Sequence, residues 1–242
     1  MKFTYLLVNF FTILVPLLYS AEPRIRFYKK WKYLFPAIFF TGAFFIIWDY
    51  FMASHQVWGF NSSYILGWYF FGLPLEEFLF FITVPYACVF IYENVSHFLD
   101  QKIFPRNEKI IVWLVSGMAL ITALLFYSKA YTFTVFLFFG LFFPIATLIL
   151  PAQRLNFFLL TYLISLIPMA IVNGLLTALP VVVYNNAQNL GIRIGTIPVE
   201  DFFYSATLLV MNISLYEWAK SRKIAGFNNS KLLNLNNNHN GS

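Results

Sequence analysis

Two short segments of the chain each combine a proline, two acids and an aromatic residue. The first is PLEEF at residues 74–78 and the second is PVEDF at residues 198–202, which begins 124 positions later. A proline followed by acids also suits the first turn of any helix, so one copy alone has an ordinary structural explanation. The second copy favours a functional site, because acids beside long apolar runs are costly and usually functional. The candidate catalytic acids are Glu76, Glu77, Glu200 and Asp201.

Burial would decide the protonation state of such acids. A helix dipole favours the ionised form by about 0.3–1 kcal/mol, whereas full burial favours the neutral form by roughly 4–7 kcal/mol. A buried member is therefore expected to stay protonated. A neutral acid held dry among aromatic rings is suited to protonating a carbon–carbon double bond, because ring faces stabilise a carbocation. The chain supplies 31 Phe, 15 Tyr and 6 Trp.

The composition places these acids in a membrane protein. The 242 residues are 60% hydrophobic and 11% charged, with a mean hydropathy of +0.70, far more apolar than a soluble domain. The lone Cys88 excludes an internal disulfide and a cysteine-based metal cluster, and no histidines lie at metal-ligand spacing. The net charge of +6 comes from short loops between apolar runs, so we expect no nucleic-acid partner.

Seven apolar runs are long enough to cross a bilayer. They predict an all-α polytopic membrane protein with transmembrane helices at residues 3–20, 33–53, 75–92, 110–127, 131–150, 157–181 and 201–218. Basic residues crowd the loops after the first, third and fifth runs and the C-terminal segment. The positive-inside rule therefore predicts an external N-terminus, a cytoplasmic C-terminus and acids toward the outer face, and we expect a bacterial inner (plasma) membrane location. The first run precedes a basic loop, which opposes a cleaved export signal.

The chain carries an internal repeat. Residues 61–93 and 185–217, compared at a fixed shift of 124, share nine identities: Asn61/Asn185, Leu66/Leu190, Gly67/Gly191, Pro74/Pro198, Glu76/Glu200, Phe78/Phe202, Thr83/Thr207, Tyr92/Tyr216 and Glu93/Glu217. Two three-helix repeats joined by one connector helix must run parallel, so their acids would lie at the same depth. We predict a first repeat at 1–100, a connector at 101–128, a second repeat at 129–220 and a disordered tail at 221–242.

Helix geometry limits which acid of each pair can face the cavity. Adjacent residues on a helix point about 100° apart, so only one acid of each pair can face a shared cavity. We expect Glu76 and Glu200 to face inward, and Glu93 and Glu217 to anchor the other helix ends. The shift also carries Asp49 onto Asn173, a polar position in both halves. The candidate substrate-binding residues are Asp49, Trp68, Phe78, Asn173, Phe202 and Tyr204.

The doubled motif, the two repeats and the Tyr-Glu pairs at residues 92–93 and 216–217 resemble the fused form of the heterodimer-type lycopene cyclases. The resemblance runs from the first helix to Trp218. It implies an all-helical membrane isomerase, an intramolecular lyase, that converts lycopene to β-carotene through γ-carotene. The implied partners are lycopene, γ-carotene, membrane lipid and other membrane enzymes of the carotenoid pathway.

Two other classes of membrane protein remain open. A proton-coupled transporter would also use repeats and buried acids, although no helix shows a polar stripe that would line an aqueous path. The other class is a retinal- or carotenoid-binding membrane protein. A retinal Schiff base needs a lysine in the last helix, and residues 201–218 contain none. Addition and loss of a proton balance, and the chain has no dinucleotide-binding glycine motif, so the prediction for the cyclase is no bound cofactor.

Overall fold

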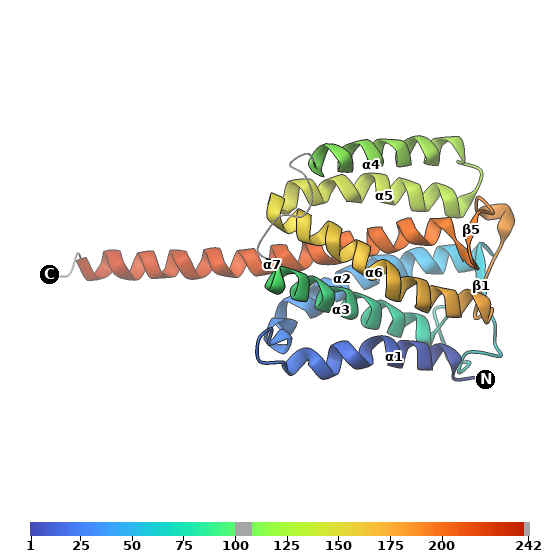
Figure 1. Ribbon diagram of the computed structural model, residues 1–242, viewed down its shortest axis with the longest axis horizontal. Coiled ribbons are helices and arrows are strands. Elements are labelled where there is room, and N and C mark those ends of the chain that lie inside the picture. Colours follow the sequence, from blue (N-terminus) through green and yellow to red (C-terminus); the bar gives the residue numbers. More distant parts are fainter. Residues whose placement is uncertain (100–107, 240–242) are drawn as a thin grey trace.

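The protein is a bundle of long helices with short strand pairs at one end (Figure 1). The computed structural model describes residues 1–99 and 108–239, with side chains described to residue 222. Within these residues seven α-helices occupy the seven predicted segments: α1 (Thr4–Leu18), α2 (Trp31–Ser54), α3 (Leu75–Phe98), α4 (Glu108–Leu125), α5 (Ala130–Ile149), α6 (Ala152–Ala178) and α7 (Val199–His239). Short 3-10 helices, η1 (Tyr19–Ala21), η2 (Phe27–Lys30) and η3 (Asn186–Gln188), lie in the connections.

The helices have the character of membrane spans. Among the described residues, six helical segments, which contain α1 to α6, are long and apolar enough to cross a bilayer. Their outward faces expose large apolar side chains such as Phe39, Leu124 and Leu148, as lipid contact requires and water contact does not favour. A seventh crossing by α7 stays a prediction. The backbone of α7 is helical to His239, but the side chains after residue 222 lie outside the described part. The predicted disordered tail at 221–242 stays a prediction.

Strands form where the sequence predicts only loops. β1 (Trp58–Phe60) pairs with β4 (Val182–Tyr184), so the loops of the two halves form one antiparallel ladder. Gly59 pairs with Val183, the residue 124 positions later. Each half also makes its own hairpin, β2 (Tyr69–Phe70) with β3 (Leu73–Pro74) and β5 (Arg193–Ile194) with β6 (Ile197–Pro198). These pairs satisfy backbone groups above the bundle, which prediction from helical patterns alone missed.

The strands recur at the same shift of 124 residues as the sequence identities. Gly67 and Gly191 both have positive φ, 88° and 75°, which only glycine adopts without strain. The loops then close alike: Leu75 N–H donates to Trp68 O at 2.8 Å, and Val199 N–H donates to Ile192 O at 3.0 Å. Both loops therefore deliver a helix start, with its two acids, in the same local geometry.

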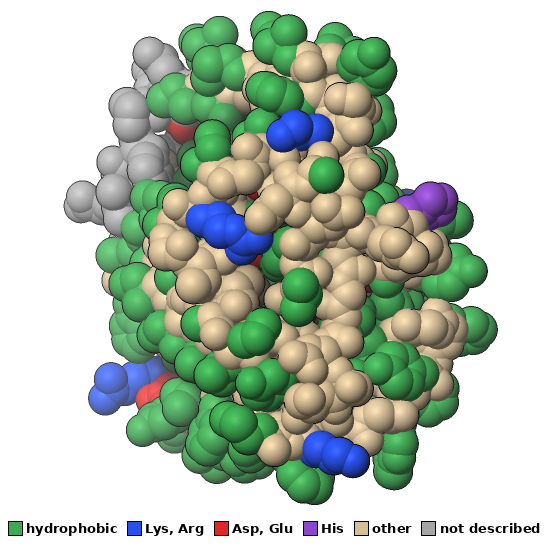
Figure 2. Space-filling view, turned by 90° about the vertical axis from the view of Figure 1, so that its right-hand side faces the viewer, with side chains coloured by type: hydrophobic (Ala, Val, Ile, Leu, Met, Phe, Trp, Pro, Cys, Tyr) green, Lys and Arg blue, Asp and Glu red, His purple; other side chains and the backbone are tan. Residues whose placement is uncertain are grey.

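Helix direction places both acidic helix starts at one end of the bundle. The starts of α1, α3, α5 and α7 and the ends of α2 and α6 lie at the end that carries the strands (Figure 1). Seen from that end, apolar side chains surround the molecule and charged ones are scattered (Figure 2). Helix α4 packs against α5, where a Cβ on Gly140 would lie 2.6 Å from Leu120 Cγ. Close helix contact thus depends on that glycine.

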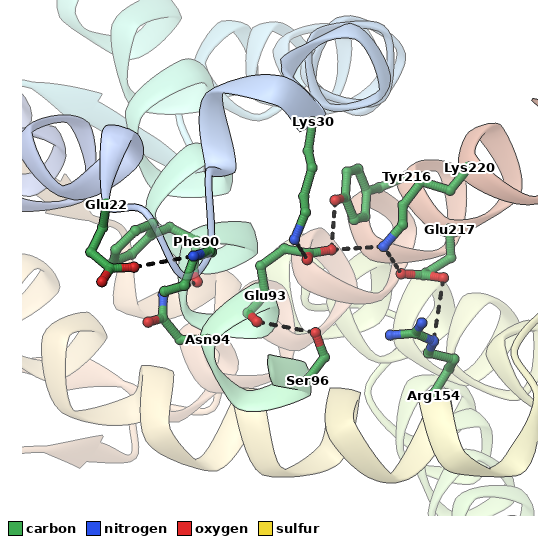
Figure 3. A network of polar contacts seen from close by, with 11 residues as sticks. Glu22, Lys30, Phe90, Glu93, Asn94, Ser96, Arg154, Tyr216, Glu217 and Lys220 are labelled. Carbon is green, nitrogen blue, oxygen red and sulfur yellow. Dashed lines mark hydrogen bonds and ion pairs between the residues drawn. The ribbon is translucent and has the colours of Figure 1, made fainter. Parts of the chain in front are cut away.

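The opposite end of the bundle holds a network of buried ion pairs (Figure 3). Lys30 of η2 pairs with the carboxylate of Glu93, and Lys220 Nζ lies 2.8 Å from Glu93 Oε1 and 3.0 Å from Glu217 Oε1. Arg154 Nε lies 3.7 Å from Glu217 Oε2. The network joins α3, α6 and α7, so Glu93 and Glu217 anchor helix ends, as predicted.

Removing Glu93 from this network is expected to destabilise the bundle. In Glu93→Gln the partly buried Lys30 loses its carboxylate, and Lys220 keeps only Glu217. The free energy of unfolding should fall by about 3 kcal/mol, the lower end of the range for buried pairs, because both lysines keep some solvent contact. Thermal unfolding in detergent measures the change. Glu22→Gln is the comparison variant, because its pair with the exposed Arg24 contributes at most about 1 kcal/mol and Gln keeps an oxygen for the N–H groups of Arg24 and Ile25. Equal melting temperatures for the two variants would contradict the assignment.

Candidate active site

A cavity of about 680 Å³ lies within the bundle and contains groups from both halves. Its walls come mainly from α1, α3, α6 and α7, with the β1–β4 ladder at one end. Acids and phenols gather at that end, and the rest of the lining is mostly apolar. Leu7, Phe11, Ile171 and Leu175 line the cavity and are also exposed on the outer surface. The cavity therefore opens toward lipid between α1 and α6.

The first half contributes a pair of carboxyls. Glu77, in the first turn of α3, accepts a hydrogen bond from Tyr5 Oη at 2.6 Å. Asp49, near the end of α2, accepts one from Tyr204 Oη at 2.9 Å. Asp49 and Glu77 also lie within hydrogen-bonding reach of each other. Both are buried, so two acids meet directly in a low-dielectric cavity.

The second half contributes one carboxyl with many donors. Asp201, in the first turn of α7, accepts hydrogen bonds from the phenol of Tyr131, from Tyr184 Oη at 3.1 Å and from Asn173 Nδ2 at 3.2 Å. Burial, followed by the nearby charge of Asp201, raises the pKa of Tyr184 well above its usual value. That phenol therefore keeps its proton and remains a donor to the carboxylate.

Aromatic rings hold these donors in place. The Tyr131 and Tyr184 rings stack with their centroids 5.6 Å apart. Tyr204 lies 4.9 Å from Trp48 and 5.0 Å from Phe45, measured between ring centroids. Such contacts fix ring orientation and add to the stability from burial. The polar end of the cavity is therefore a rigid arrangement of acids, phenols and aromatic faces.

The expected orientation of the adjacent acids is reversed. Glu77 and Asp201 line the cavity, whereas Glu76 and Glu200 do not. Glu76 Oε1 accepts the backbone N–H of Leu66 at 2.7 Å, the residue ten positions before it. Glu200 Oε1 accepts the equivalent N–H of Leu190 at 2.7 Å. Because the preceding loop folds back over the helix start, it captures the first acid of each pair, and the second then faces the cavity.

The candidate substrate-binding residues divide into two groups. Asp49, Asn173 and Tyr204 line the cavity. Trp68, Phe78 and Phe202 do not: Trp68 is largely exposed in the loop before β2, and Phe78 and Phe202 each follow a cavity-facing acid by one position, which turns them away.

Sequence reasoning missed three phenols of the site, Tyr5, Tyr131 and Tyr184. Tyr5 and Tyr131 occupy the second residue of α1 and of α5, but they are 126 positions apart, so a comparison at a fixed shift of 124 does not align them. A comparison that allows gaps would have found that pair. Tyr184 aligns with Phe60 and gives no repeat signal.

The site is arranged for proton transfer. Within the described residues no group of three or more His, Cys, Asp and Glu side chains is placed to hold a metal ion. The described lining of the cavity contains no Lys, Arg or His, so its acids are balanced by protons and by hydrogen bonds. An acid in this setting transfers its proton in the absence of bulk water. The apolar remainder of the cavity suits a long hydrocarbon ligand.

Comparison with known proteins identifies the family. A family model described as lycopene cyclase matches residues 2–95 and 128–219, two segments that cover most of the chain and correspond to the internal repeat. No curated protein and no solved structure matches the chain.

The role of Glu200 in holding its loop can be tested by amide exchange. Glu200→Ala removes the acceptor for Leu190 N–H, so that amide hydrogen should exchange with solvent roughly tenfold faster, the effect expected for the loss of one hydrogen bond of about 1–1.5 kcal/mol. Glu200→Gln keeps an oxygen acceptor and should change the rate less. The Leu66 amide, which Glu76 holds, is the internal control. Unchanged exchange at Leu190 in Glu200→Ala would refute the role.

Proposed function

Because the chain belongs to the lycopene cyclase family, we propose that it is a lycopene β-cyclase, an isomerase of carotenoid biosynthesis that converts lycopene to β-carotene through γ-carotene. One observation carries the assignment: Asp49, Glu77 and Asp201 meet at one end of an otherwise apolar cavity that opens toward lipid. A hydrocarbon substrate needs the apolar walls, and the reaction needs an acid where water is scarce.

The chemistry requires one proton to be added and one to be lost. A carboxyl O–H adds its proton to a terminal carbon–carbon double bond of the substrate, which leaves a carbocation. The neighbouring double bond attacks this cation and closes the ring. A carboxylate then removes a proton from a ring carbon and forms the new double bond. Atoms and electrons balance without a reductant or an oxidant, and aromatic faces near the acids stabilise the cation.

The position of the acids supports closure of one ring at a time. From Glu77 to Ile91 the cavity follows α3, a length of about 21 Å at ~1.5 Å per residue. A polyene can lie along this apolar stretch with one end at the acids. Its other end then lies far from any carboxyl of the lining. The one-ring product, γ-carotene, must therefore turn round before the second ring closes.

We further propose two parallel three-helix repeats, α1–α3 and α5–α7, with α4 as the connector. The equal shifts of strands, loops and acidic helix starts support this arrangement. Substrate and product partition into membrane lipid, so access between α1 and α6 suits both. Other membrane enzymes of the carotenoid pathway are candidate partners, because they share these lipid-dissolved intermediates.

The pigment made in a lycopene-accumulating host tests the function. Expression of the chain should yield β-carotene, with γ-carotene appearing first in a time course. Glu77→Gln and Asp201→Asn should each leave lycopene, because general acid–base groups contribute roughly 10²–10⁴-fold. Glu22→Gln, which lies outside the cavity, is the matched control and should retain β-carotene. Lycopene unchanged by the folded native chain would refute the function.

The orientation in the membrane is a separate proposal. We propose an external N-terminus and a cytoplasmic C-terminus in a bacterial inner membrane, and the bias of basic residues among the loops supports this orientation. Reporter fusions at the two ends should then report opposite sides. Both reporters on one side would contradict a seventh crossing by α7.

A further inference from the structure

The two halves of the protein place different groups at one equivalent position of the cavity. Asp49 of α2 and Asn173 of α6 are 124 positions apart, and both line the cavity beside the second acid of their own half. Asp49 lies beside Glu77, and Asn173 donates to Asp201. The first half therefore holds a carboxyl–carboxyl pair, and the second half holds an amide–carboxylate pair.

The carboxyl–carboxyl pair must carry a proton. Two ionised carboxylates at hydrogen-bonding distance repel strongly in a low dielectric, and neither has a hydrogen to donate to the other. The described cavity lining offers no cation to offset a double charge. Each member of the pair accepts one hydrogen bond from a phenol: Tyr5 donates to Glu77, and Tyr204 donates to Asp49. One phenol each is too little to hold two anions, so Asp49 and Glu77 share at least one proton.

The amide–carboxylate pair is built for an anion. Asn173 points its amide nitrogen at Asp201, and the phenols of Tyr131 and Tyr184 donate to the same carboxylate. Three donors satisfy an acceptor-only group, and bonds to the charged form favour ionisation. A proton on Asp201 would weaken all three bonds, because a neutral carboxyl is a poorer acceptor than a carboxylate. Asp201 is therefore the group of the cavity best prepared to stay negative.

Resting on the proposed cyclase function, we propose that the two halves have diverged in role: the Asp49–Glu77 pair donates the proton that starts ring closure, and Asp201 is the anion that faces the carbocation and takes the second proton. The O–H bond of the pair breaks as a C–H bond forms on the substrate. The C–H bond of the ring then breaks as Asp201 gains a proton. One proton passes back from Asp201 to the pair before the next turnover.

The opposite assignment, in which the Asp201 side of the cavity donates the first proton, lacks a ready proton source. Asn173 has no acidic hydrogen, and the phenols around Asp201 are far weaker acids than a carboxylic acid. Each of those phenols already directs its hydrogen at the carboxylate. One difference between the halves, Asp49 in the first and Asn173 in the second, thus gives the first half the acid and the second half the anion.

Infrared spectroscopy tests the protonation pattern independently of catalysis. The full-length protein in lipid should show the C=O band of a buried protonated carboxyl. Glu76 and Glu200 are also buried, so the test compares difference spectra against the native protein. Asp49→Asn and Glu77→Gln should each remove a component of that band, and Asp201→Asn should remove none. Glu22→Gln is the control for an acid outside the cavity. A band that is unchanged in both Asp49→Asn and Glu77→Gln would overturn the proposal, as would a component lost in Asp201→Asn alone.

Exchange of the two residues tests the division of roles. Asp49→Asn replaces the carboxyl–carboxyl pair of the first half with an amide–carboxylate pair. Asn173→Asp replaces the amide–carboxylate pair of the second half with a carboxyl–carboxyl pair. Each single variant should lose cyclisation by about 10²–10⁴-fold, the usual contribution of a general acid or base. The double variant, which exchanges the pairs, should recover at least tenfold over the weaker single variant. Purely additive losses would overturn the division of roles.

These outcomes are separable from failure of the cyclase function. If the native chain forms no rings from lycopene while the infrared pattern is as expected, the function is wrong and the proton-sharing pair stands. If rings form in deuterated water but Asp49→Asn still adds one deuterium per ring at the native rate, the function stands and the pair is not the donor. Retained melting temperatures in detergent show that the variants are folded.

Discussion

Removal of carboxyl groups from water is the constraint on which the rest of this structure depends. Asp49, Glu77 and Asp201 line a cavity whose described walls carry no basic side chain, so each charge must be removed by a proton or offset by directed hydrogen bonds. Four tyrosines supply most of those bonds, from α1, α5, β4 and α7. The β1–β4 ladder joins the loops of both halves beside them. Much of the structure at this end therefore supplies the hydrogen bonds and packing that buried acids require.

The two ends of α3 solve the same problem in opposite ways. Glu93, near its far end, is offset by Lys30 and Lys220, and the resulting ion pairs join helices of both halves. Glu77, in its first turn, accepts a hydrogen bond from the Tyr5 phenol and lies beside Asp49. Basic partners produce a stable anion that resists protonation, which suits an anchor. Phenols and a second carboxyl leave a proton available, which suits transfer to a substrate. The anchoring acid and the proposed reactive acid thus lie about 24 Å apart along one helix, at ~1.5 Å per residue.

The parts of the fold that depend on long patterns could be predicted from the sequence, and those that depend on tertiary contacts could not. Apolar length gave the seven helical segments, and the repeated PxE(E/D)F pattern located both acidic helix starts. Which adjacent acid faces the cavity depends on where the preceding loop returns, because Leu66 N–H and Leu190 N–H capture Glu76 and Glu200. No periodicity encodes that contact. The short strands were missed for the same reason, since the β1–β4 pairing joins residues 122 to 126 positions apart only after the helices have packed.

Fusion of two similar halves in one chain allows equivalent positions of the cavity to hold different residues, which two identical halves would not allow. In a symmetric assembly, any residue at the position of Asp49 would occur twice, so both halves would hold a carboxyl pair or both an amide pair. Two carboxyl pairs would crowd four acids into one cavity, where repulsion and burial favour protonation and would leave no ready anion. Two amide pairs would favour two anions and leave no acid. One chain can hold Asp49 in one half and Asn173 in the other, an arrangement that allows the proposed proton and negative charge to lie a short distance apart. Ring closure by proton addition and loss needs both, because the cation formed by the acid must be stabilised and then deprotonated before water reaches it.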